Sequence, residues 1–143
     1  MSPRNGSRSP VLSPGRVLVP ADPHRRLECF LVDVFPTGFD LHTRFPLPVD
    51  ELVAAEVEDH LVLADVKRCE LHAGKFHLEL ERLYAVPLDR FDDQSIADPE
   101  AKLRVVLEEF LQQRAESLAD AESYEARNLL ERARAAVCAL EEA

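Results

Sequence analysis

Long apolar runs, paired cysteines and catalytic motifs are all missing from this chain of 143 residues. No apolar run approaches the ~18 residues that a membrane-spanning helix needs, so we expect no membrane insertion. The first 20 residues contain four prolines and lack both a continuous apolar segment and a small-residue cleavage site, which argues against a secretory signal. The three cysteines form no Cys-x-x-Cys pair, which favours reduced thiols and a cytoplasmic location.

Signatures of catalysis and of metal binding are also lacking. The chain has no Gly-x-Ser-x-Gly elbow, no P-loop, no His-Glu-x-x-His pair and no recognisable Ser/His/Asp set, so we predict that it is not an enzyme. Cys69, His72 and His77 lie near one predicted hairpin, but strand parity separates Cys69 from His72, and no fourth ligand follows at zinc-site spacing. We therefore expect these three residues to be structural, and we expect neither a metal nor another resident cofactor.

The net charge of -10 is unevenly distributed along the chain. Residues 1–28 carry five basic and two acidic side chains, whereas residues 29–143 carry twelve basic and twenty-five acidic ones. A body this acidic argues against binding to duplex nucleic acid, because that affinity depends on neutralising phosphates. A basic arm on an acidic body is suited to holding one small anion, and the alternative is a solvated terminus without a ligand.

Strand signals occupy residues 15–86. Alternating apolar and polar residues, bounded by turn residues, predict a hairpin turn at Ala73-Gly74 and strands at about 16–19, 27–34, 39–43, 52–57, 60–71 and 75–84. Six short strands with no helix between them predict a small antiparallel β-barrel or sandwich. A flexible basic arm at 1–14 precedes this domain, and a linker at 87–97 follows it.

The remaining residues, 98–143, predict a helical extension. Asp98 suits an N-cap and Pro99 suits the first helical position. Apolar stripes at 103–111 and 126–140 do not share one register, so the extension is either one long helix with a stutter or a helical hairpin. The absence of Gly and Pro after Pro99 favours one long helix.

A single helix over residues 100–143 would be about 66 Å long, which exceeds the diameter of a small domain. Its distal stripe would then need a cover, so we expect a homo-oligomer that associates through the C-terminal helix. The alternative is that the apolar face packs back onto the barrel.

Three sequence features of the arm and the barrel occur in a recognisable order: Arg4-Asn-Gly-Ser-Arg8, the segment at 31–41 with Asp33 and Gly38, and the predicted hairpin at 62–80. In this order they resemble the PilZ family. Arg4-Asn-Gly-Ser-Arg8 matches the family's Arg-x-x-x-Arg arm motif, the segment at 31–41 is similar to its Asp-x-Ser-x-x-Gly turn and the strand that follows it, and residues 62–80 look like its last hairpin. The resemblance covers roughly residues 15–86 and implies a six-stranded PilZ-like β-barrel.

The resemblance also implies a ligand, cyclic dimeric GMP, and a set of binding residues. Arg4 and Arg8 would pair with its phosphates or guanine edges, Asp33 would hold the nucleotide or an arginine, and Gly38 would allow a tight backbone turn. Phe35 stands where the family has Ser. Arg25 and Arg26 form an alternative anion clamp, but we expect them to lie at a solvated hairpin tip.

Three functions follow from these observations. The first is a PilZ-like regulatory module that binds cyclic dimeric GMP and passes the signal to a protein partner. The second is a PilZ-like adaptor that binds a protein in motility, pilus or polysaccharide regulation, without a nucleotide. The third is an unrelated barrel scaffold with an oligomerising helix.

Overall fold

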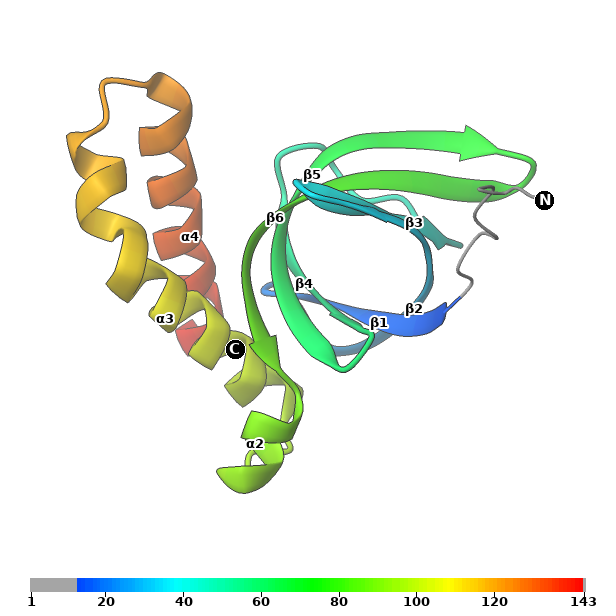
Figure 1. The fold of residues 1–143 in the computed structure, drawn as a ribbon, viewed down its shortest axis with the longest axis horizontal. Helices are drawn as coiled ribbons and strands as arrows, with labels where there is room; N and C mark the ends of the chain where they lie inside the picture. Colours follow the sequence, from blue (N-terminus) through cyan, green and yellow to red (C-terminus); the bar gives the residue numbers. More distant parts are fainter. Residues whose placement is uncertain (1–12, 143) are drawn as a thin grey trace.

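The computed structural model describes residues 13–142, which form a closed β-barrel with helices packed on one side (Figure 1). The elements in chain order are β1 (Ser13–Val19), β2 (Asp22–Phe35), β3 (Gly38–Thr43), β4 (Leu52–Val57), β5 (His60–His72), β6 (Lys75–Pro87), α2 (Asp89–Asp93), α3 (Pro99–Asp120) and α4 (Tyr124–Glu142). The predicted six-stranded antiparallel barrel with a C-terminal helical region is therefore confirmed.

The strands follow one another around the barrel in the order β1-β2-β3-β6-β5-β4, and β1 closes the barrel by pairing with β4. All neighbouring strands are antiparallel. At the predicted β5–β6 turn, Ala73 and Gly74 have φ angles of 51° and 79°, the left-handed conformation that two-residue hairpin turns require. Arg25 and Arg26 lie within β2 rather than at a hairpin tip, so their expected position was wrong.

Two hydrophobic cores share the barrel wall. Alternate side chains of all six strands fill the interior, where Phe39, Leu41 and Leu78 are almost fully buried. The outer faces of β1, β4, β5 and the end of β6 form a second core with the helices. Strands buried on both faces need apolar residues at consecutive positions, which explains the unbroken buried runs at 52–55 and 61–64. In contrast, the outer face of β3 and of the first half of β6 is polar and partly exposed.

The helical extension is a hairpin, so the preference for one long helix was wrong. Helix α3 ends at Asp120, Ala121 is extended (φ -67°, ψ 141°), and Ser123 Oγ then accepts a hydrogen bond from Ala126 N at 3.3 Å. Figure 1 shows α3 and α4 running in opposite directions beside the barrel. Because the two apolar stripes differ in register, a reversal of the chain is what lets both reach the second core. Because Ser123 caps the second helix, the break between the helices requires neither Gly nor Pro.

The predicted cap of the first helix is confirmed. Asp98 accepts a hydrogen bond from Ala101 N at 3.1 Å, and Pro99 occupies the first turn. The segment expected as a linker contains α2, whose Phe91 is fully buried in the second core. The helical region and the barrel therefore share one core rather than being joined by a free tether.

The distal apolar stripe of the extension is covered within the same chain. Leu130, Ala133 and Leu140 of α4 are buried against α3 and the barrel wall. The reason for expecting self-association through this helix therefore no longer applies. Across residues 13–142, none of the helices combines the length and the apolarity that a bilayer span requires.

Candidate functional site

The hairpin that joins β2 to β3 carries the two described residues of the predicted ligand site. Asp33 pairs with Asp40 across the strands, and Phe35 pairs with Gly38 next to the turn. Ser13 of β1, the first described residue, pairs with Leu31, which lies two residues before Asp33 on β2. Arg4 and Arg8 lie outside the described residues. The structure therefore brings Asp33 and Gly38 together, at the end of the barrel where β1 begins.

Asp33 lies on the outer face of the sheet beside a second carboxylate. A shift in pairing register between Leu31 and Asp33 places it opposite Asp40, and paired residues share one face of a sheet. Asp33 Oδ1 accepts a hydrogen bond from Val34 N at 2.9 Å. Two adjacent carboxylates repel a phosphate and attract a cation. This position is therefore suited to holding an arginine rather than a phosphate group.

Gly38 is required for a reason other than the predicted turn. A Cβ at this position would lie 1.9 Å from the carbonyl oxygen of Leu80 on β6. Among the described glycines only Gly74 has a positive φ, so Gly38 does not need glycine's conformational freedom. Its role is to let β3 pass close to β6.

A cavity of about 360 Å³ opens beside the hairpin at this end of the barrel. Its wall is mostly apolar, with Leu31, Val34 and Phe39 on the hairpin side, while His60 and Arg82 supply polar groups. Arg82 is exposed, and its backbone N–H donates to Thr37 O in the hairpin turn at 2.9 Å. Sequence reasoning missed Arg82. The sequence gives only a weak signal for this residue, because Arg82 is a single basic residue that follows the alternating strand at 76–80.

A chain of polar side chains crosses the exposed outer face of β3 and β6. His77 Nε2 lies 3.1 Å from Asp40 Oδ2, and His77 Nδ1 lies 3.1 Å from His42 Nε2. Because the carboxylate accepts from Nε2–H, a neutral His77 presents its Nδ1 lone pair to the N–H of His42. Within residues 13–142, the other carboxylate oxygen of Asp40 is buried and has no hydrogen-bond partner. These contacts connect the middle of β3, at Asp40, to His42 near the end of that strand.

Burial, followed by the nearby His77 imidazole and Lys75, lowers the pKa of His42 below its ordinary value of 6.5, although Asp40 acts in the opposite direction. The unfolded chain therefore binds a proton at a higher pH than the folded chain does. Because of His42, we expect the free energy of unfolding to fall as the pH drops below about 6.5. The free energy of unfolding should recover when the pH is raised again.

Urea unfolding at pH 5, 6 and 7 measures this effect. The His42→Ala variant is expected to lose stability less steeply on acidification than the native chain. Val49→Ala, which truncates an exposed apolar residue and removes no titratable group, is the control. An equal pH dependence in the native chain and in His42→Ala would contradict the expectation.

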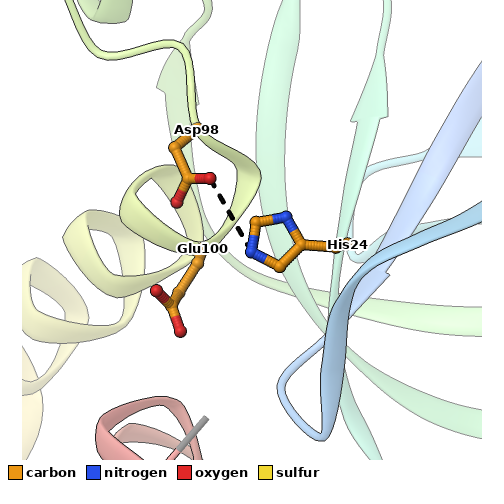
Figure 2. A group of neighbouring side chains, drawn as sticks. All are labelled: His24, Asp98 and Glu100. Carbon is orange, nitrogen blue, oxygen red and sulfur yellow. Dashed lines mark ion pairs between the residues drawn. The ribbon is translucent and has the colours of Figure 1, made fainter.

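The structure describes one group of three side chains that could hold a metal ion, and it differs from the group weighed in the sequence. His24, Asp98 and Glu100 each offer an atom within 4.8 Å of the others, where β2 begins beside the start of α3 (Figure 2). One imidazole nitrogen and two carboxylates suit a divalent transition metal. However, His24 and Asp98 are 58% and 50% exposed, their contact is a 3.7 Å ion pair, and Asp98 already caps α3. We assign this group a structural role at the junction.

The sequence prediction about Cys69, His72 and His77 concerned the β5–β6 hairpin. The rings of His72 and His77 lie edge to face with their centroids 6.3 Å apart. Cys69 does not join them in a group of possible metal ligands among residues 13–142.

Comparisons of the chain with family models, with curated proteins and with solved structures find no match.

Proposed function

We propose that this protein is a PilZ-like regulatory module of second-messenger signalling that binds cyclic dimeric GMP at the hairpin end of the barrel. The observation that supports it most is the position of Ser13, which pairs with Leu31 of β2, four residues before the β2–β3 turn begins at Phe35. The basic segment 1–12 therefore joins the barrel opposite Leu31, two residues before Asp33, at the end of the barrel that carries the β2–β3 turn. We propose no catalytic role, and we place the protein in the cytoplasm.

The arm is long enough to reach such a ligand. Arg8 and Arg4 precede Ser13 by five and nine residues, so an extended chain would reach about 17 Å and about 31 Å. The four steps along the strand from Leu31 to Phe35 span about 13 Å. Both guanidinium groups are therefore within reach of a ligand at the turn.

The charges at the hairpin assign different tasks to the residues. Asp33 and Asp40 would repel the two phosphates of the ligand, so their task is to hold an arginine of the arm in place. The phosphates are then paired with the arginine forks, and Arg82 supplies a further cation at the rim of the cavity. Phe35 offers an aromatic ring for stacking where the family's Ser would offer a hydroxyl.

Isothermal titration calorimetry of the full chain with cyclic dimeric GMP tests the proposal. We expect saturable binding at ligand concentrations of tens of micromolar, and a loss of at least tenfold in the Arg4→Ala/Arg8→Ala variant, because charge-assisted pairs to phosphate are removed. Arg127→Ala/Arg134→Ala is the matched control, since it removes two exposed arginines of α4. Absence of heat at these concentrations would reject a receptor role, and binding that survives the arm substitutions would reject this site.

The second candidate function is an adaptor that binds a protein and no nucleotide. The paired carboxylates, the apolar cavity and Val34, which is 38% exposed, favour it. Such a surface suits a partner with an apolar residue next to a basic one. The same titration separates the two functions, because an adaptor gives no heat with the nucleotide.

A further inference from the structure

A hollow on the outer face of β2 and β3, away from the β2–β3 turn, is lined by cations and aromatic rings. Its volume is about 370 Å³. The side chains that matter for its chemistry are Arg26, Phe30, His42, Arg44, Phe45 and Lys75. We propose that this hollow is a second site, which binds a small aromatic anion of the mononucleotide class.

The hollow keeps a net positive charge, because three cationic residues and one acidic residue, Glu28, line it. Arg26, Arg44 and Lys75 come from three separate segments, and none of them has an ion pair or a side-chain hydrogen bond to another residue within 13–142. Among the described residues, Arg16 is paired with Glu56 and Lys67 with Asp65. Arg25 and Arg82 also have no ion pair within 13–142, but they do not line this hollow. Three cations that converge without partners, in a chain of net charge -10, form a site for an anion.

The hollow also presents aromatic surface. Phe30 lies in the middle of β2 with 49% of its surface exposed, at a position where β2 could carry a polar residue. Phe45 lies at the edge of the hollow, half-buried against the barrel core. A planar base that stacks on Phe30 would remove apolar surface from water, and such stacking is worth about 1–3 kcal/mol per base. A phosphate on the same ligand would lie among the three cations.

The surroundings limit the size of the ligand. Glu28 lines the hollow, and Asp33, Asp40 and Glu79 lie further along the same face of the sheet, towards the turn. A long polyanion that crossed this face would meet those carboxylates. A volume of about 370 Å³ is at the lower end of small-molecule sites. Both observations favour one compact anion over a nucleic-acid strand.

This second site does not depend on the proposed function. Arg26 precedes Asp33 by seven residues of β2, or about 23 Å along the strand. Its cations are described residues of the barrel, whereas the proposed cyclic dimeric GMP site depends on Arg4 and Arg8. A negative result for one of the two sites therefore does not contradict the proposal of the other site.

Calorimetry of the full chain with GMP tests the inference, with guanosine and inorganic phosphate as the two partial ligands. We expect GMP to bind with a dissociation constant below about 1 mM, and each partial ligand to bind at least tenfold more weakly. Arg44→Ala/Lys75→Ala and Phe30→Ala should each weaken GMP binding about tenfold or more. Arg127→Ala/Arg134→Ala and Arg4→Ala/Arg8→Ala should leave it unchanged.

Amide chemical shifts give a readout that does not depend on any variant. Addition of GMP to the native chain should shift the amide resonances of Phe30, His42 and Arg44, and leave those of α4 in place. No saturable binding, phosphate binding as tightly as GMP, or shifts confined to residues outside the hollow would each overturn the inference.

Discussion

Replacing Gly38 with alanine is expected to lower the free energy of unfolding by about 3 kcal/mol or more. The added Cβ would lie 1.9 Å from Leu80 O, and that oxygen belongs to the backbone of a neighbouring strand rather than to a flexible side chain. β3 and β6 would have to separate, which would disturb the ladder from Gly38↔Glu81 onwards and the hydrophobic packing of Phe39 below it.

Urea unfolding followed by circular dichroism measures the loss, and Gly74→Ala is the matched control. Gly74 has a φ of 79°, but a Cβ added there would meet no heavy atom within 4 Å, so alanine costs only the left-handed backbone strain of about 1–2 kcal/mol. A Gly38→Ala variant no less stable than Gly74→Ala would contradict the expectation, because the close approach of the strands would then cost no more than left-handed backbone strain. Retained cyclic dimeric GMP binding by a folded Gly38→Ala variant would agree with a structural rather than a binding role.

Removing either partner of the Asp65–Arg132 ion pair is expected to cost about 3–5 kcal/mol. The side chain of Asp65 on β5 is 2% exposed, and its two oxygens accept from the guanidinium of Arg132 on α4 at 2.8 and 3.2 Å. Arg132 also donates to Asp50 O at 2.6 Å, and Lys67 Nζ lies 3.1 Å from Asp65 Oδ2. Truncation of one partner leaves a charge that was desolvated for the pair.

Four variants measured by urea unfolding separate the value of the pair from the cost of an unpaired charge. Asp65→Ala and Arg132→Met are the single changes, and Asp65→Leu/Arg132→Met replaces the pair with apolar groups. We expect the double variant to recover much of the stability that each single variant loses, because no charge is then left buried. Arg134→Met, on an exposed position of α4, is the control and should change stability by less than about 0.5 kcal/mol. A single variant as stable as that control would show that the pair does not anchor α4.

The barrel could be predicted from the sequence because its strands alternate clearly and turn residues separate them. The alternation at 76–80 and the Ala73-Gly74 turn indicated one hairpin, and both are found where they were expected. The reversal at Ala121 could not be predicted in the same way. It depends on where α4 finds buried contacts, and Ser123 caps it without a strong local signal. The unbroken apolar runs at 52–55 and 61–64 were a usable sign that the helices cover the barrel.

The candidate sites show a similar limit. Asp33 and Gly38 are close in sequence, so their presence on one hairpin followed from the spacing. Arg26, Arg44 and Lys75 are far apart in sequence, and only the strand register brings them to one hollow. The sequence also suggested the wrong reason for Gly38, because a close approach between strands leaves no local mark in the residues around it.

The closure of the barrel restricts how a partner can recognise this protein. Because β1 pairs with β4, the closed part of the sheet offers no free edge to which a peptide can add as a further strand, a common way for β-domains to capture extended segments. β5 is longer than β4, and among the described residues 13–142 its end at 68–72 pairs with β6 alone. Within the same residues, β2 at 22–28 pairs with β1 alone and β6 at 83–87 pairs with β5 alone, so strand addition is restricted to singly paired ends such as these. Recognition elsewhere on the barrel must use side chains, so one substitution can change specificity there without any change in strand pairing.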